Sequence, residues 1–270
     1  MFIKIKYRLP ISRNYSTLGN STIITEKNGT TGIITLNRPK QLNAINSTMQ
    51  DEILLTVQEF DTSPDIKCII ITGTGNVFSA GADLKELSTK PDPTTIFRKW
   101  NQLKNINKPI IGAVNGIAYG GGCELAMFTD IILASEKAEF SQPEIKHALI
   151  PGMGGTQRLT KFIGKSNSML HCLTGRPINA LTAVNMGLVS IVTKHGELMK
   201  EALILSNEIG SMSVPMVTLI KKCINESYET NLEDGINYEW SAFLKASETK
   251  DYKEGIASFL EKRQAKWTNE

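Results

Sequence analysis

The chain has 270 residues, of which 41% are hydrophobic and 21% are charged. This length and composition are sufficient for a sizeable buried core, and they exclude disordered, collagen-like and disulfide-scaffold proteins. Apolar runs such as residues 69–71 and 131–133 are far shorter than the roughly 20 residues of a membrane-spanning helix, so we expect no membrane insertion.

The positive net charge is concentrated at the N-terminus. Lys and Arg number 30 against 27 Asp and Glu, but residues 1–25 contain no acid and four bases, Lys4, Lys6, Arg8 and Arg13. The rest of the chain therefore has 26 bases and 27 acids, a net charge of −1, and gives no argument for nucleic-acid binding. The acid-free segment predicts a mitochondrial transit peptide over residues 1–21, with a simple basic tail as the alternative.

The cysteines are widely spaced and form no CxxC pair, so nothing in the sequence indicates a zinc site or a disulfide framework. Cys68, Cys123, Cys172 and Cys223 are most simply small buried apolar side chains. A reducing compartment together with the predicted leader indicates the mitochondrial matrix.

The first half of the chain alternates predicted strands and helices. Continuous apolar strands are expected at residues 32–36, 68–72, 110–114 and 131–134. They are typical of a parallel sheet that is buried on both faces, which predicts an α/β fold. An amphipathic helix over residues 48–60 would begin at a capping box made by Ser47 and Gln50. Further helices are expected over 94–106 and 123–128.

From Thr156 onward the pattern is almost entirely helical. The predicted helices span residues 156–163, 166–173, 179–186, 197–209, 214–228, 231–246 and 250–262. The organisation is therefore an α/β core followed by a helical C-terminal part.

Two nucleotide-binding motifs are incomplete. Gly73 and Gly75 follow a strand, but Phe78 stands where a dinucleotide fingerprint needs its third glycine. The run Gly164–Ser166 resembles the end of a P-loop, but Leu159 stands where its first glycine would be. Neither motif predicts a nucleotide cofactor.

Two other loops combine small residues with a helix start. Residues 78–85 join a strand to a short helix, and residues 115–124 place the glycines of 120–122 at the beginning of a helix. Free N–H groups there favour a phosphate or a developing oxyanion, and a second N–H from the first loop could converge on the same oxygen. Alternatively, the glycines only permit tight strand–helix packing.

Two carboxylates lie beside these glycine-rich turns. Glu124 directly follows the glycine cluster, and Glu144 precedes a second glycine-rich turn at residues 151–155. A glutamate in a first helical turn is often only a partner of the helix dipole. Burial and mutual repulsion could instead make the two an acid–base pair around one water.

At these residues the chain resembles the crotonase (enoyl-CoA hydratase/isomerase) superfamily, and within it the mitochondrial short-chain hydratases. The similarity covers about residues 22–267, and its most specific segments are residues 37–44, 78–85, 113–130, 142–145 and 150–159. The resemblance implies a spiral of ββα turns over residues 22–210. It also implies a helical trimerisation region over 211–270 and a homo-oligomer arranged as a dimer of trimers.

The resemblance also assigns the binding groups. The backbone N–H groups of Ala82 and Gly121 would form an oxyanion hole for a thioester carbonyl, and Lys85 would lie near the phosphates or adenine of coenzyme A. The substrate-binding residues implied in this way are Ala82, Asp83, Leu84, Lys85, Gly121 and Gly152.

In the family reaction, water adds syn across a 2-trans-enoyl-CoA and gives a 3-hydroxyacyl-CoA in fatty-acid or branched-chain amino-acid breakdown. By resemblance, Glu124 would activate the water and Glu144 would transfer the proton at Cα. No metal or redox cofactor is expected, because coenzyme A is part of the substrate. The resemblance thus implies an acyl-CoA thioester as the partner, and no nucleic acid.

The sequence departs from the family pattern at two places. Ala148 stands where many relatives have glycine, and the segment between Lys85 and Asn115 is a few residues shorter than usual. Both departures concern the acyl pocket and leave chain-length preference open.

Two other activities on the same scaffold are alternatives: isomerisation of 3-enoyl-CoA, and hydration of a methylglutaconyl-CoA-type substrate. Isomerases commonly keep one of the two acids, so the presence of both Glu124 and Glu144 favours hydration. A non-catalytic, RNA-associated member of the family is the alternative from a different functional class.

Overall fold

The structure is a computed structural model that describes residues 14–15, 21–89 and 99–270. The predicted leader therefore falls almost entirely outside the described residues. The predicted helix over 94–106 is described only from residue 99 onward, where the structure has the 3₁₀-helix η2 (Trp100–Asn105).

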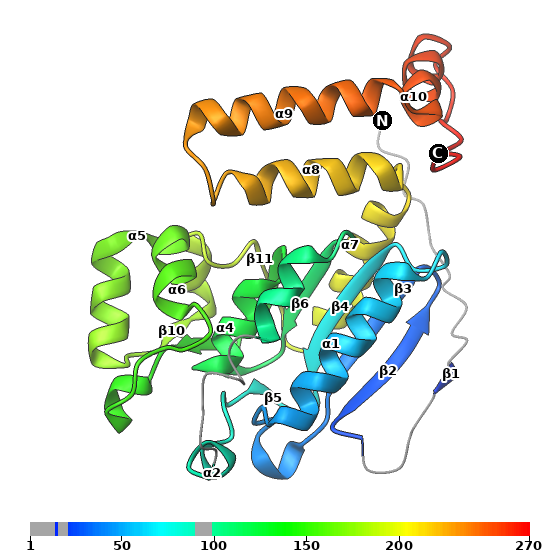
Figure 1. The fold of residues 1–270 in the computed structure, drawn as a ribbon. Helices are drawn as coiled ribbons and strands as arrows, with labels where there is room; N and C mark the ends of the chain where they lie inside the picture. Colours follow the sequence, from blue (N-terminus) through cyan, green and yellow to red (C-terminus); the bar gives the residue numbers. More distant parts are fainter. Residues whose placement is uncertain (1–13, 16–20, 90–98) are drawn as a thin grey trace.

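Two sheets form the framework (Figure 1). In the larger sheet, β1 pairs antiparallel with β2, and β2 pairs antiparallel with β3. All the pairs from β3 to β11 are parallel. Its strands in spatial order are β1 (Asn14–Tyr15), β2 (Ile23–Asn28), β3 (Thr31–Leu36), β4 (Cys68–Gly73), β6 (Ile110–Val114), β8 (Ile131–Ser135) and β11 (Ile191–Thr193). The smaller sheet has the order β10 (Ile178–Asn179), β9 (Glu139–Ser141), β7 (Ile117–Tyr119) and β5 (Val77–Ser79).

The chain contributes one strand to each sheet in every turn: β4 then β5, β6 then β7, β8 then β9. A helix follows each pair, namely α2 (Leu84–Leu87), α4 (Gly121–Phe128) and η3 (Glu144–His147). This is the predicted spiral of ββα turns. Because β5, β7 and β9 are parallel neighbours, the segments that leave their carboxyl ends lie along one edge of the small sheet.

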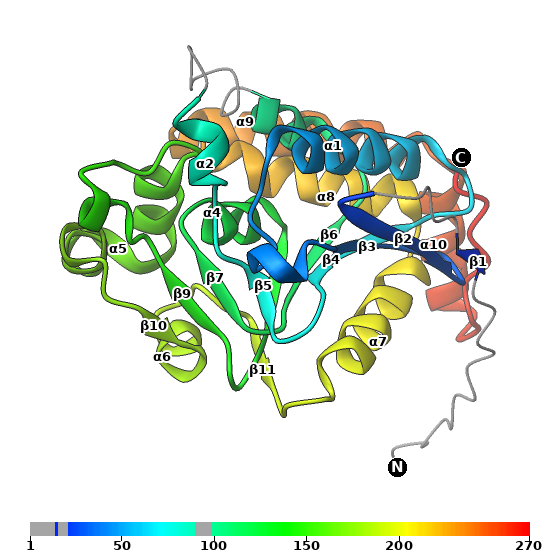
Figure 2. The same cartoon turned by 90° about the horizontal axis from the view of Figure 1, so that it is seen from below.

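The large sheet is buried on both faces, as its apolar strands predict. Alternate side chains of β4 point to opposite sides: Ile69 and Ile71 belong to one core cluster, and Cys68 and Ile70 to the other. The first cluster packs against α1 (Ser47–Thr62) and the second against α7 (Leu198–Gly210). Figure 2 shows α1 and α7 on opposite faces of the sheet.

The start of α1 differs from the predicted capping box. Asn46 is the N-cap, because its backbone is extended and its side chain accepts a hydrogen bond from the Met49 N–H at 2.9 Å. Ser47, expected to be the cap, is the first helical residue, and its N–H donates to Glu86 instead. The predicted apolar face of this helix is buried.

The C-terminal half is helical, as predicted. Two predicted helices form one element, α5 (Gly155–Thr174), which is interrupted at Gly164 by a positive φ of 78°. The others are α6 (Ala180–Asn185), α7, α8 (Val214–Glu226), α9 (Leu232–Ser247) and α10 (Lys250–Leu260).

Helices α8, α9 and α10 stand to one side of the sheets (Figure 1). Lys221 of α8 attaches this part to the large sheet: its Nζ lies 2.7 Å from an Asp130 carboxylate oxygen and 2.9 Å from the Lys108 carbonyl oxygen. In the described part of the chain no single helix could cross a membrane; only the pair α7 and α8, bent by 109°, reaches that length and composition.

Candidate functional site

The loop after β5 is held against the backbone of Ile45. The Ile45 N–H donates to the Gly81 carbonyl oxygen at 2.8 Å, and the Asp83 N–H donates to the Ile45 carbonyl oxygen at 2.9 Å. These two bonds lie on either side of Ala82. Within the described residues, the Ala82 N–H has no hydrogen-bond partner of its own.

The first helical residue of α4 lies beside this loop. A Cβ added to Gly121 would stand 3.3 Å from the Ala82 amide nitrogen and 2.8 Å from the end of the Met153 side chain, so Gly121 lies directly beside the Ala82 N–H. Across the part of the chain that is described, the Gly121 N–H also has no partner. Two unpaired backbone donors, from Ala82 and Gly121, are thus neighbours at the positive end of a helix dipole.

The glycine cluster serves packing as well. A Cβ on Gly122 would stand 2.4 Å from the Ser79 carbonyl oxygen, so close strand–helix contact requires that glycine. The two interpretations of the cluster therefore apply to different residues. Gly122 packs against β5, and Gly121 faces Ala82.

Glu124 is fixed in one orientation. Its side chain is on the first turn of α4 and is only 2% exposed. One carboxylate oxygen, Oε1, accepts hydrogen bonds from the Met153 and Gly155 N–H groups, each at 2.7 Å. Burial raises the pKa of Glu124 above its usual value, although these two bonds and the nearby Arg158 act to lower it.

Glu144 approaches the same place from η3. Its Oε1 lies 3.1 Å from the point where a Cβ on Gly120 would stand, so this carboxyl group reaches the glycine cluster. Its Oε2 is buried and has no hydrogen-bond partner among the described residues. Burial first, and then the charge of Glu124, raise the pKa of Glu144 to about 7.

The two acids therefore differ in how they are held. Glu124 is bound by two backbone donors that favour its ionised form, whereas Glu144 has an unpaired buried oxygen and titrates near neutrality. Such a difference between neighbouring carboxyl groups is typical of a base and an acid that act together.

A pocket of about 510 Å³ adjoins the Ala82 loop. Four of the predicted substrate-binding residues line it: Ala82, Asp83, Leu84 and Lys85. Asp83 forms a 2.9 Å ion pair with Arg38. This contact lowers the pKa of Asp83 even though burial acts to raise it. Arg38 also donates to the Ala44 carbonyl oxygen at 2.6 Å, so one guanidinium ties two walls of the pocket together.

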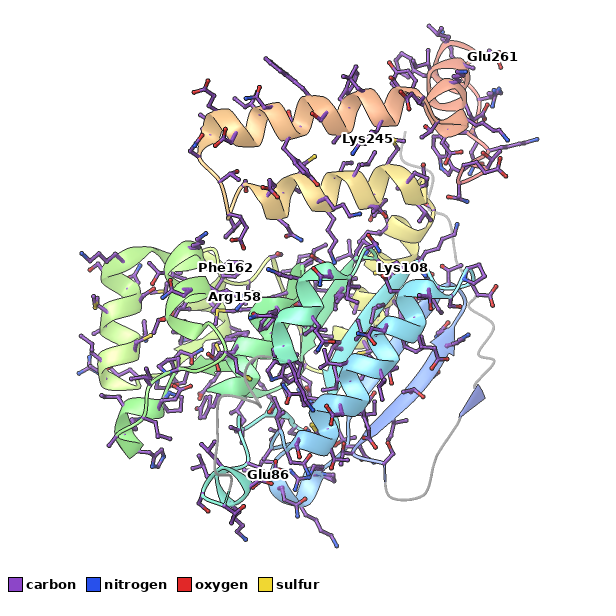
Figure 3. All side chains as sticks on the ribbon, in the orientation of Figure 1. Glu86, Lys108, Arg158, Phe162, Lys245 and Glu261 are labelled. Atoms are coloured by element: carbon purple, nitrogen blue, oxygen red, sulfur yellow. The ribbon has the colours of Figure 1, made fainter. Side chains whose placement is uncertain are left out.

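The short helix α2 contributes Leu84, Lys85 and Glu86 to the lining of this pocket, and Glu86 is labelled in Figure 3. Asp83 caps it by accepting from the Lys85 N–H at 3.2 Å, and Glu86 accepts from the Ser47 N–H at 2.7 Å. Lys85 is exposed at the rim. A cation there complements an anionic ligand that enters from solvent.

The structure thus brings Ala82, Gly121, Glu124 and Glu144 together. Gly152 is exposed, and the amides of this turn that bind Glu124 are those of Met153 and Gly155. Gly121 and Gly152 are not among the residues that line the pocket.

Sequence reasoning did not find the roles of Met153, Gly155, Arg38 and Arg158. The glycine-rich turn of residues 151–155 was a signal for backbone donors, but residue type cannot indicate which amide is turned toward a carboxylate. Arg38 and Arg158 lie in segments that resemble the family, and charge alone did not distinguish them from surface bases.

Comparison with known proteins agrees with this fold. The family model described as enoyl-CoA hydratase/isomerase matches residues 26–270. A Dictyostelium discoideum protein named "Probable enoyl-CoA hydratase, mitochondrial" is 48% identical over 252 residues, which are 92% of this chain and 91% of that protein. The mitochondrial enoyl-CoA hydratase of Pongo abelii is 43% identical over 271 residues, with 97% and 93% covered.

The solved structures agree as well. The enoyl-CoA hydratase subunit I of Geobacillus kaustophilus HTA426 superimposes with a TM-score of 0.89 at 37% identity, covering 92% of this chain and 98% of that one. The α/β spiral is therefore the crotonase fold, as predicted. The chain belongs to the enoyl-CoA hydratase/isomerase family.

Proposed function

We propose that this protein is an enoyl-CoA hydratase that adds water syn across a 2-trans-enoyl-CoA and releases a 3-hydroxyacyl-CoA, in fatty-acid or branched-chain amino-acid breakdown. One observation carries the proposal. An amide-bound Glu124 and a Glu144 with a buried, unpaired oxygen lie beside two unpaired backbone N–H groups. The family match and the names of relatives support the same activity.

In this proposal the N–H groups of Ala82 and Gly121 bind the thioester oxygen. As water attacks Cβ, negative charge develops on that oxygen, and preorganised donors stabilise it; losing one such donor costs about 3–4 kcal/mol in other enzymes. Glu124 holds the water through its second oxygen and takes its proton. Glu144, protonated through its raised pKa, delivers a proton to Cα.

In this proposal, the coenzyme A part of the substrate occupies the pocket beside the Ala82 loop. Coenzyme A would lie along the 510 Å³ pocket, with Lys85 near its phosphates or adenine. Gly152 remains a proposed backbone contact near the water. Two carboxyl groups and two N–H donors supply the acid, the base and the charge stabilisation, so the proposed reaction uses no metal or redox cofactor, and coenzyme A arrives as part of the substrate.

The isosteric variants Glu144→Gln and Glu124→Gln test this assignment. Each removes one proton-transfer group and should lower kcat for crotonyl-CoA by roughly a thousandfold without unfolding the protein. Glu139→Gln is the matched control: Glu139 is at the opposite end of β9 and accepts from the Tyr119 hydroxyl at 2.7 Å, so its variant should keep the wild-type rate.

A Glu144→Gln variant that turns over at the wild-type rate would show that the acid assignment is wrong. The competing activities are separated by assaying wild type with crotonyl-CoA, a 3-enoyl-CoA and 3-methylglutaconyl-CoA side by side. Faster turnover of either of the last two overturns the proposed substrate. Salt-dependent RNA affinity without any turnover would support the non-catalytic alternative.

We also propose that the protein is a mitochondrial matrix enzyme and a dimer of trimers. Two relatives have names that include a mitochondrial location, and residues 1–21 have the composition of a transit peptide. Fusing residues 1–21 to a fluorescent protein tests the location, because a diffuse cytosolic signal would contradict it.

A further inference from the structure

We propose that Arg158 is a positioning residue for the Glu124 carboxylate: it holds the turn of residues 151–155 in the shape that directs two amides at Glu124. The inference rests on the function proposed above, since it concerns the base of that reaction. Arg158 lies in the first turns of α5, where this helix packs against α4 (Figure 3).

The first link is a hydrogen bond to Met153. The Arg158 Nη1 donates to the Met153 carbonyl oxygen at 3.0 Å, and the N–H of the same Met153 donates to Glu124 Oε1 at 2.7 Å. The guanidinium therefore fixes a residue that itself holds the carboxylate. Movement of the Met153 backbone would move one of the two donors to Glu124.

The second link is the packing of the guanidinium between the turn and α4. A Cβ on Gly154, whose φ is 97°, would stand 2.1 Å from Nη1, so only glycine leaves room for Arg158 here. On its other side the guanidinium lies over the Phe128 ring, 3.5 Å from the centroid. Phe128 is the last residue of α4, and Glu124 is in the first turn of the same helix. Arg158 therefore contacts both the turn that donates to the Glu124 carboxylate and the helix that carries it.

Arg158 affects Glu124 through its charge as well as through its hydrogen bond to Met153. The groups that act on Glu124 are the amides of Met153 and Gly155 and the guanidinium of Arg158, and Glu124 in turn acts on Glu144 and on the thiols of Cys123 and Cys172. Among the described residues, Glu229 in the turn after α8 is the other acid whose charge acts on Arg158. Of these groups, Arg158 is the one cation, and its charge favours ionised Glu124.

Three variants separate positioning from simple packing. Arg158→Met keeps the apolar stem but loses the charge and the hydrogen bond, and Arg158→Lys keeps the charge. Lys161→Met is the matched control, because Lys161 is on the same helix, lies 5.1 Å from the centroid of the Tyr228 ring and donates to the Tyr228 carbonyl oxygen, without acting on Glu124.

We expect Arg158→Met to lower kcat by roughly tenfold to a hundredfold, with little change in KM, because a displaced base misaligns the water. The acidic limb of its pH–rate profile should move to higher pH, since Glu124 loses a stabilising cation, while the basic limb stays in place. Arg158→Lys should keep the wild-type acidic limb and recover part of kcat. Lys161→Met should match wild type in both measurements.

If kcat falls equally in Arg158→Met and Arg158→Lys and the acidic limb does not move, Arg158 acts only by packing and the proposal is wrong. A wild-type kcat in Arg158→Met also overturns the proposal. A crystal structure of Arg158→Met gives a readout that is independent of turnover: we expect the Met153 N–H to lose its bond to Glu124. An unchanged bond overturns the inference. A wild-type protein without hydratase activity would instead contradict the proposed function, so failure of that proposal can be distinguished from failure of the inference about Arg158.

Discussion

Burial gives Glu144 the property on which its proposed role depends. An acid that must deliver a proton is active only while it is protonated, and a pKa of about 7 keeps much of Glu144 protonated at neutral pH. An ordinary glutamate, with a pKa near 4.5, would be almost fully ionised there.

The pH dependence of turnover follows from this value. We expect kcat to fall as the pH rises through about 7, because Glu144 loses its proton, and to recover when the pH is lowered again. Steady-state kinetics between pH 5 and 9 will show this fall of kcat on the basic side of the pH–rate profile, and Glu144→Gln will lack it. A wild-type rate that stays constant up to pH 9 contradicts the role of Glu144.

Ala148 is a second residue where the local conformation has a measurable consequence. It is the C-cap of η3 and has a φ of 55°, in the left-handed region where a Cβ is strained. Ala148→Gly should raise the free energy of unfolding by about 0.5–1 kcal/mol, the relief of strain less the added chain entropy. Urea denaturation measures this; a less stable variant would show that the alanine is not strained.

At the scale of elements, substitutions at the beginning of α4 can distinguish loss of the Gly121 N–H donor from steric effects. Gly121 is the first helical residue, a position where proline is tolerated by helix geometry, so Gly121→Pro removes the N–H without breaking the helix. We expect kcat to fall by roughly a hundredfold to a thousandfold in this variant.

Gly121→Ala is the control for this prediction. It keeps the N–H and adds a Cβ that would stand 3.3 Å from the Ala82 amide nitrogen and 2.8 Å from the end of the Met153 side chain, which is flexible enough to shift. Its loss of kcat should be much smaller than that of Gly121→Pro. Equal losses in the two variants would show that sterics, and not the N–H, explain the effect.

The accuracy of the predicted elements varied with their length. The strands of the large sheet that are continuous apolar runs were predicted correctly from those runs, and the amphipathic helix α1 from its helical periodicity. The small sheet was not predicted, because β5, β7 and β9 have three residues each, too few to show a period. The cap of α1 was misplaced by one residue, because Asn46 and Ser47 both favour an N-cap and only the backbone conformation distinguishes them.

At the scale of the whole molecule, the C-terminal helices expose many large apolar side chains. Trp240 and Leu244, one turn apart on α9, are 64% and 65% exposed, and Phe259 of α10 is 82% exposed. Exposure of this kind marks an interface between proteins. It supports the proposed assembly of copies of this chain.

The oligomeric state tests this directly. Analytical ultracentrifugation of wild type should show a hexamer, and the double variant Trp240→Glu, Leu244→Glu should shift it toward smaller species, because charges would be buried at the contact. Glu208→Lys on α7 is a control for a change of surface charge and should leave the hexamer intact. A monomeric wild type contradicts the proposed assembly.

The sequence by itself determined the α/β class, the doubly buried strands, the helical C-terminal part and the segments that resemble the family, because each of these depends on local periodicity or on short motifs. It also singled out Glu124, Glu144 and the two glycine-rich loops. Only the tertiary structure decided that the Met153 and Gly155 amides hold Glu124, that Gly121 lies beside Ala82, and that Arg158 packs on Gly154. These contacts join segments far apart in the chain, and they exist because parallel pairing of β5, β7 and β9 brings the ends of successive turns to one edge. The pKa of Glu144 was decided in the same way, since burial is a property of the packed molecule and not of the residue.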